Sequence, residues 1–361
     1  MKPRPLLTQV LIHPETISGL TLRDWDLLIR QARHSNLLGR LASRLATCQL
    51  LTQVPAQPRS HLESALGVAQ RQMQAVQWEV NRIVQALDQI PTPIILLKGA
   101  AYIMLQLPTA QGRLFSDVDI LVSKPQLEAV ELALKIHGWI TTHHDAYDQR
   151  YYRNWMHELP PMQHLTRQTL LDVHHTILPE TARYHPDPKL LLEAALPLAD
   201  DDHVKVLAPA DMLLHSATHL FHEGELKHGL RDLTDLDSLL RHFSMQDETF
   251  WEKLIARAQQ LDLARPLYYA LRYTTMMLDT PVPPATLRAA QVNAPSWITR
   301  KLMDALFRRA FQPPHPSCED WLTKPALWML FVRAHWLKMP PWLLLRHLFH
   351  KAFISPKDST A

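Results

Sequence analysis

Two short stretches decide how this chain is expected to fold: residues 94–99 (Ile-Ile-Leu-Leu-Lys-Gly) and residues 113–122 (Arg-Leu-Phe-Ser-Asp-Val-Asp-Ile-Leu-Val). The first is a continuous apolar run that ends in a glycine turn, which is typical of a strand covered on both faces. The second predicts a strand that carries Asp117 and Asp119. Side chains two residues apart on a strand point to the same face, so these two carboxylates are expected to converge on one point.

Further strands are predicted around these two. Residues 139–142 and 170–177 show β-like runs, and a helix ending at a His-Gly pair is expected over residues 123–136. Residues 91–207 therefore form an α+β unit with a small mixed β-sheet, here called the palm.

Helical periodicity marks the sequence on both sides of the palm. Apolar residues at three- and four-residue spacing predict helices over residues 22–45 and 60–90, and the same period returns over residues 211–221 and 230–243. The chain is thus divided into an N-terminal helical region, the palm and a C-terminal helical domain: residues 1–90, 91–207 and 208–361.

Composition limits the classes of protein to consider. The chain has 361 residues, a net charge of +3 and 47% hydrophobic residues, which are values of a globular protein with a core. Its two cysteines favour a cytoplasmic protein without disulfides. The most apolar stretch, residues 326–349, is interrupted by charges and prolines, so we expect a buried or amphipathic helix pair and no membrane span.

The convergent carboxylates indicate metal chemistry. Magnesium prefers oxygen ligands, commonly carboxylates together with substrate phosphates. Nucleotidyl transfer uses two such ions, one on the triphosphate and one on the attacking hydroxyl. Asp117 and Asp119 would supply two carboxylates. Asp172 lies in a β-like apolar run where an unpaired carboxylate is costly to bury, so it is the candidate for the third metal ligand and for activating the acceptor.

Four nearby residues are candidates for binding the nucleotide. Gly99 follows a strand and opens a short helix, where backbone N–H groups are able to approach a phosphate. Lys98 and Arg113 are cations suited to the β- and γ-phosphates, and Ser116 offers a hydroxyl. His174, two residues after Asp172, shares its strand face and is a possible supporting residue, although a structural histidine fits equally well.

The order of these elements resembles the DNA polymerase beta-like nucleotidyltransferase superfamily. More closely, it is similar to a bacterial uncharacterised nucleotidyltransferase family with the pattern L-K-G…R-x-x-S-D-x-D-L-L-V and a later D-x-H element, matched here by residues 97–99, 113–122 and 172–174. The resemblance covers most of the chain. It implies metal binding by Asp117 and Asp119, with Asp172 completing the triad.

The sequence also departs from the better-characterised members of that superfamily. Those carry Gly-Ser after the first strand, whereas Ala100 follows Gly99 here. The spacer between Gly99 and Asp117 is longer than usual. A serine hydroxyl at the turn is therefore not available for the phosphates, and Lys98 or Arg113 would substitute for it.

Two other features invite functional interpretations. His215 and His219 lie four residues apart on a predicted helix, but no Glu follows His215 as the H-E-x-x-H zinc pattern demands. Packing against the palm is the preferred interpretation, with Asp232 or Asp235 pairing a histidine or Arg231. The aromatic residues of the C-terminal stretch are expected to pack in a helical core rather than to form a membrane or RNA surface: Trp321, Trp328, Phe331, Trp336 and Trp342.

The sequence thus predicts a magnesium-dependent nucleotidyltransferase, with Mn²⁺ as a possible substitute. It would move a nucleoside monophosphate from a nucleoside triphosphate to a hydroxyl or phosphate of a peptide, protein or small molecule. The low net charge disfavours a long nucleic acid as acceptor. The alternatives are a non-catalytic nucleotide-binding scaffold and a toxin-like transferase that acts on tRNA.

Overall fold

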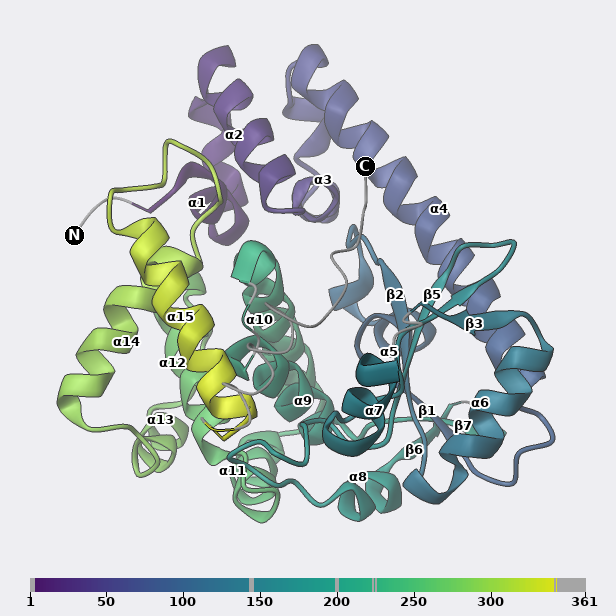
Figure 1. Cartoon of the computed structure of the whole chain (residues 1–361). Helices are drawn as coiled ribbons and strands as arrows, with labels where there is room; N and C mark the ends of the chain where they lie inside the picture. Colours follow the sequence, from purple (N-terminus) through teal and green to yellow (C-terminus); the bar gives the residue numbers. More distant parts are fainter. Residues whose placement is uncertain are drawn as a thin grey trace.

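A mixed β-sheet occupies the middle of the chain, and helices from both ends surround it (Figure 1). The computed structural model describes residues 4–142, 146–198, 201–222, 224, 226–340 and 342. Within these residues the sheet has seven strands in the order β3-β4-β5-β2-β1-β7-β6. The strands are β1 Ile94–Leu96, β2 Asp117–Leu121, β3 Trp139–Thr141, β4 Met162–His164, β5 Leu170–His174, β6 Leu196–Leu198 and β7 Asp201–Val206. The predicted α+β class is confirmed.

The centre of the sheet is apolar and buried. The strand β1 pairs antiparallel with β2 and parallel with β7, while β2 pairs parallel with β5. The side chains of Ile94, Ile95 and Leu96 are all buried, as expected of a strand covered on both faces. This centre holds β2 and β5 side by side, and the predicted acidic residues lie on these two strands.

The helices form groups around the sheet (Figure 1). The N-terminal group packs at one end, α9 and α10 lie in the middle, and α11 to α15 lie on the side away from the sheet. The α-helices are α1 Leu6–Ile12, α2 Leu22–His34, α3 Leu38–Thr47, α4 Ala56–Ala86, α5 Lys98–Met104, α6 Leu127–Ile136, α7 Ala146–Trp155, α8 Pro188–Ala194, α9 Pro209–His222, α10 Gly229–Gln246, α11 Phe250–Gln260, α12 Ala264–Leu278, α13 Pro284–Gln291, α14 Trp297–Ala310 and α15 Thr323–Lys338. The 3₁₀ helices are η1 Pro14–Gly19, η2 Leu51–Gln53, η3 Pro108–Ala110, η4 Lys124–Gln126 and η5 Leu226–His228.

Two hydrophobic cores hold these groups together. The larger runs without interruption from the end of α4 through the sheet and α9–α12 to α14 and α15. The smaller lies within α1–α4 and also takes in Leu230 of α10. The palm and the C-terminal helices therefore share one core, and the N-terminal helices contribute a second core that touches α10.

Several predicted elements differ from the structure. The helix predicted over residues 22–45 is two helices, α2 and α3, because Asn36 between them takes a left-handed φ of 58°, which asparagine tolerates better than most residues. The strand predicted over residues 170–177 ends at His174. Three strands were not predicted: β4 and β6 are only three residues long, and β7 alternates polar and apolar residues in a charged stretch.

The prediction that the five C-terminal aromatic residues pack in the core is wrong for all of them. Trp321 is 84% exposed and Trp328 is 66% exposed, and Phe331, Trp336 and Trp342 are also exposed. Their spacing places them on the outer face of α15 and its flanks, while Ala326, Leu330 and Ala334 form the buried face. In the part of the chain that the structure describes, none of the helices combines the length and apolar character needed to cross a bilayer. The second half of the predicted helix pair, beyond residue 342, lies outside the described residues.

Candidate active site

Three carboxylates converge at the centre of the sheet. Strands β2 and β5 are parallel and in register, so that Asp119 lies directly beside Asp172. Asp117 is two residues before Asp119 and therefore lies on the same face of the sheet. One carboxylate oxygen from each of the three residues lies within 4.8 Å of the other two. The structure thus brings together the three residues that the sequence predicted as metal ligands.

Asp119 is the most buried of the three, with 5% of its surface exposed. Its Oδ1 accepts a hydrogen bond from His174 Nε2 at 3.1 Å and lies 3.6 Å from Lys98 Nζ. Burial opposes the charge of Asp119, but Lys98 and His174 outweigh it and hold the pKa of Asp119 well below its usual range. Because both contacts described for Asp119 use Oδ1, Oδ2 is the oxygen left to face a cation.

The other two carboxylates hold their charge less easily. Burial, with the neighbouring charges of Asp119 and Glu158, raises the pKa of Asp172 to about 7. Burial and the charge of Asp119 also raise the pKa of Asp117, although Lys98 acts against this shift. Three carboxylates this close repel one another, and a divalent cation between them would relieve the repulsion. The donor set is made of carboxylate oxygens alone and therefore fits magnesium.

The turn that leads from β1 into α5 carries both Lys98 and Gly99, and the two residues have different structural roles there. The residue with the left-handed backbone is Lys98, with a φ of 39°, not Gly99. A Cβ on Gly99 would lie 2.5 Å from Cδ1 of the Phe115 ring, so glycine is needed there for close packing. The strained turn directs Lys98 toward Asp119, and positive φ at a residue other than glycine is common at functional sites.

Ser116 and Arg113 lie at the entrance to β2. The Ser116 hydroxyl donates a hydrogen bond to Asp117 Oδ1 at 3.0 Å. Arg113 Nε donates to Asp235 Oδ2 at 2.8 Å, and its guanidinium lies over the Phe115 ring. Burial opposes the charge of Arg113, but the carboxylate of Asp235 outweighs it and raises the pKa of Arg113. Arg113 therefore keeps its charge while two of its three nitrogens contact the protein, Nε through Asp235 and Nη1 through the carbonyl oxygen of Leu114 at 3.4 Å.

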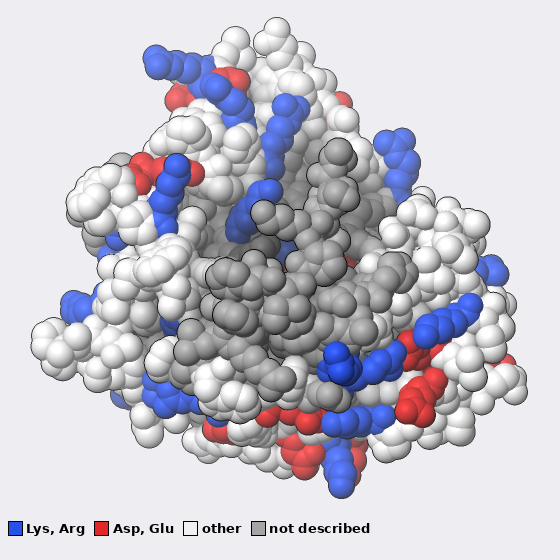
Figure 2. Space-filling view, in the orientation of Figure 1, with Lys and Arg blue, Asp and Glu red and all other residues white. Residues whose placement is uncertain are grey.

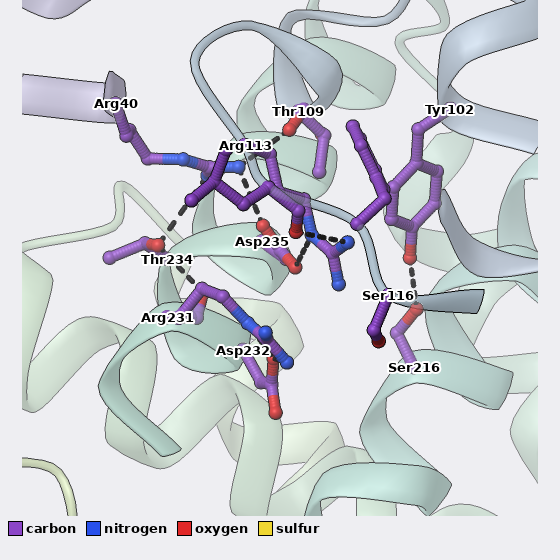
Figure 3. A network of polar contacts seen from close by, with 12 residues as sticks. Arg40, Tyr102, Thr109, Arg113, Ser116, Ser216, Arg231, Asp232, Thr234 and Asp235 are labelled. Atoms are coloured by element: carbon purple, nitrogen blue, oxygen red, sulfur yellow. Dashed lines mark hydrogen bonds and ion pairs between the residues drawn. The ribbon is translucent and has the colours of Figure 1, made fainter. Parts of the chain in front are cut away.

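Asp235 joins three parts of the chain, as Figure 3 shows. Its second oxygen, Oδ1, accepts a hydrogen bond from Arg40 Nη2 of α3 at 2.6 Å, and the same nitrogen donates to the carbonyl oxygen of Thr109 at 2.5 Å. Next to this group on α10, Arg231 pairs with Asp232 at 2.7 Å, which is one of the pairings the sequence had suggested. The importance of Arg40 was not predicted, because nothing in the sequence links α3 to a residue nearly two hundred positions later.

These residues surround one cleft of about 630 Å³, counting its open mouth. The cleft is lined both by the carboxylates of Asp117 and Asp119 and by Arg113 and Arg231. The cleft is lined by Lys98, Gly99, Tyr102, Arg113, Ser116, Asp117, Asp119, Ser216, His219, Arg231, Asp232 and Asp235.

Several polar residues lie beside the triad: Glu158 was not predicted, and His215 and His219 were predicted only to pack against the palm. Glu158 interacts with His174, and its own pKa is raised by burial. His215 and His219 of α9 lie within reach of the charge of Lys98, and burial lowers their pKa well below the usual value. The adjacent His157-Glu158 pair is a signal that the sequence did offer, but nothing in it placed this pair next to residue 174.

Comparison with known proteins decides the family. Residues 21–279 match the family described as uncharacterised nucleotidyltransferase. The chain belongs to this family. Comparisons with curated proteins and with solved structures give no match. The family match covers the whole palm and α2–α12, so it includes every residue of the acidic triad and of the cleft.

Proposed function

We propose that this family member transfers a nucleoside monophosphate from a nucleoside triphosphate to an acceptor hydroxyl or phosphate and releases pyrophosphate. The observation that carries the proposal is the convergence of Asp117, Asp119 and Asp172 on adjacent strands, within 4.8 Å of one another, with Asp117 and Asp119 lining a cleft. A non-catalytic descendant would be under no pressure to keep three mutually repelling carboxylates together.

The three carboxylates would have different roles. Asp117 and Asp119 would hold two magnesium ions, with Asp172 as a further ligand on the acceptor side. When bound, magnesium neutralises the triphosphate and favours ionisation of the attacking group. A new bond joins the acceptor oxygen to the α-phosphorus, the bond from that phosphorus to the bridging oxygen breaks, and pyrophosphate leaves. Asp172 would take up the proton that a hydroxyl acceptor loses.

The cations at the cleft would bind the triphosphate. Lys98 lies beside Asp119, and Arg113 lines the same cleft with its Nη1 close to Gly99, so a triphosphate in the cleft would meet positive charge at two points. Arg113 is fixed through Nε by Asp235, and Nη1 donates a long hydrogen bond to the carbonyl oxygen of Leu114, so Nη2 and the second N–H of Nη1 would contact phosphate oxygens. The backbone at Gly99 would complete the phosphate contacts, together with the Ser116 hydroxyl once it turns from Asp117 to a phosphate oxygen.

The acceptor is proposed to be a peptide, a protein side chain or a small molecule. On the face drawn in Figure 2, lysine and arginine side chains stand singly or beside acidic ones, apart from a short line that runs from the N-terminal helices toward the middle. A long nucleic acid usually requires a broad, continuous basic surface. The arrangement on this face favours a compact acceptor.

The proposal is tested with nucleoside triphosphates labelled at the α-phosphate, incubated with magnesium and separated cell fractions: peptides and metabolites, proteins, and tRNA. Transfer of label to the first or second fraction, absent with Asp119→Asn, is the expected result. Label on tRNA would replace the proposed acceptor by the toxin-like alternative. No labelled product from any fraction would overturn the enzymatic assignment and favour a nucleotide-binding scaffold.

A further inference from the structure

A second cluster of metal-binding side chains lies behind the acidic triad. His157, Glu158 and His174 each offer one ligand atom, and these atoms lie within 4.8 Å of one another. The cluster does not line the cleft, and its members are mostly buried: the side chain of His174 is 4% exposed and that of Glu158 is 16% exposed. It contributes two imidazoles and one carboxylate, which is a donor set different from that of the triad.

The backbone fixes this cluster firmly. The segment that follows α7 runs alongside β5, where Glu158 forms an antiparallel bridge with His174. The amide of Leu159 donates to the carbonyl oxygen of Val173 at 2.9 Å, and the amide of His175 donates to that of His157 at 2.9 Å. Because these hydrogen bonds flank the cluster on both sides, the three ligands are held in place without help from an ion.

The hydrogen bonding of His174 prepares it to be a metal ligand. Its Nε2 lies 3.1 Å from Asp119 Oδ1, and a carboxylate accepts hydrogen bonds, so Nε2 carries the proton. In the neutral ring, the lone pair is then on Nδ1. Among the described residues this Nδ1 is buried and has no hydrogen-bond partner, and the same is true of Nδ1 in His157. A histidine that donates one nitrogen to a carboxylate and offers the other is the usual arrangement at zinc sites.

We propose that His157, Glu158 and His174 bind a Zn²⁺ ion, with His174 acting through Nδ1. Zinc readily takes imidazole nitrogens together with a carboxylate, with a fourth position left for water. Magnesium would not favour the two imidazoles, so the two sites would select different ions.

An ion pair between protonated His174 and Glu158 is the competing explanation of the same geometry. The distance from His174 Nδ1 to Glu158 Oε2 is 3.4 Å, yet the pair does not meet hydrogen-bond geometry. His157 faces the same carboxylate, with its Nε2 3.8 Å from Glu158 Oε2 and its ring 5.2 Å from that of His174. A bound cation would take one ligand atom from each of the three residues, including the unpartnered Nδ1 of His174.

Zinc would also affect the neighbouring triad. Coordination through Nδ1 would lock the proton of His174 on Nε2 and so hold Asp119 Oδ1 in place. This consequence rests on the proposed function, whereas zinc binding itself does not.

The test is a competition titration of the metal-free full chain with Zn²⁺ against a chromophoric chelator, in excess Mg²⁺ so that the triad is occupied. One tight site per chain is expected. The variants Glu158→Gln and His157→Ala should weaken it by at least about 10-fold. His137→Asn, which removes an exposed histidine, and Asp117→Asn/Asp172→Asn should leave it unchanged.

Co²⁺ bound to the wild-type chain provides a second measurement that needs no variant. The visible absorption bands of a four-coordinate site with nitrogen ligands are expected, and adding Zn²⁺ should remove them. Absence of a tight site in the wild-type chain would overturn the proposal. So would a site that survives both Glu158→Gln and His157→Ala, or one that disappears with Asp117→Asn/Asp172→Asn, since the ion would then belong to the triad.

Discussion

At the scale of single residues, the structure gives a different reason for the glycine at position 99 than the sequence motif suggests. Gly99 was expected at a turn where backbone N–H groups approach a phosphate, yet the left-handed residue of that turn is Lys98. Gly99 is instead required because the Phe115 ring occupies the space of a Cβ. No sequence pattern reveals that contact, since it depends on where the chain returns sixteen residues later.

The substitution Gly99→Ala should therefore destabilise the protein, by about 1–3 kcal/mol, because the added methyl group overpacks the core at Phe115. Glycine-to-alanine changes inside helices usually stabilise by about 0.5–1 kcal/mol. Gly67 in α4 is the matched control, since nothing lies within 4 Å of its would-be Cβ. Denaturant unfolding of both variants is the measurement. A stabilised Gly99→Ala variant would contradict the packing explanation.

At the scale of elements, the acidic triad was predictable and its surroundings were not. The spacing within β2 and the apolar context of Asp172 were enough to predict three convergent carboxylates, because strand geometry fixes side-chain direction locally. The cleft also needs α3, α9 and α10, which lie far from β2 in the sequence. The loop from α5 to β2 packs on α3 through Gly39 and Gly112, where a Cβ on either residue would meet backbone atoms within 2.5 Å.

Asp235 connects these elements, so removing its side chain should lower the stability of the protein. Asp235→Ala would leave Arg40 and Arg113 buried without their carboxylate partner, and we expect a loss of about 3–5 kcal/mol in the free energy of unfolding.

Asp26→Ala is the control for that substitution, because it removes an exposed pair with Arg30 on α2 and should cost at most about 0.5 kcal/mol. The denaturant midpoints of the two variants are compared, provided that the free energy of unfolding depends equally steeply on denaturant concentration in both. Equal losses would show that Asp235 does not hold α3, the loop and α10 together.

At the scale of the whole molecule, buried histidines should limit stability in acid. Burial and the charge of Arg333 lower the pKa of His222 to about 4, so the folded protein keeps this ring neutral while the unfolded chain protonates it near pH 6.5. Stability should fall as the pH drops below 6.5, with about 2 kcal/mol lost to His222 alone between pH 7 and pH 5. Burial also lowers the pKa of His157, His215 and His219, so these residues make the loss of stability with falling pH steeper.

Unfolding of the wild type and of His222→Asn at pH 7 and pH 5 measures this effect. Asparagine is able to replace the Nδ1 donor that contacts the carbonyl oxygen of Thr218, so the variant should fold and lose less stability on acidification. An identical pH dependence in both proteins would exclude His222 as a contributor.

The fold as a whole was predictable in class but not in detail. Helices were predicted from long stretches with apolar residues at helical spacing, and the central strand from the apolar run at residues 94–97. Both patterns follow from local geometry. The strands β4 and β6 are only three residues long, and β7 joins the sheet by pairing with the distant strand β1, which composition does not reveal. The same applies to the exposed tryptophans of α15, which have an apolar character typical of a core.

The central claim is that Asp117, Asp119 and Asp172 form a magnesium-dependent nucleotide site. Calorimetric titration with each of the four non-hydrolysable nucleoside triphosphate analogues, with and without Mg²⁺, tests it most directly. We predict magnesium-dependent binding that is lost in Asp117→Asn/Asp119→Asn and retained in Asp262→Asn, a control at a left-handed position that asparagine tolerates. Equal binding by wild type and the double variant, or no binding of any analogue, would contradict the claim.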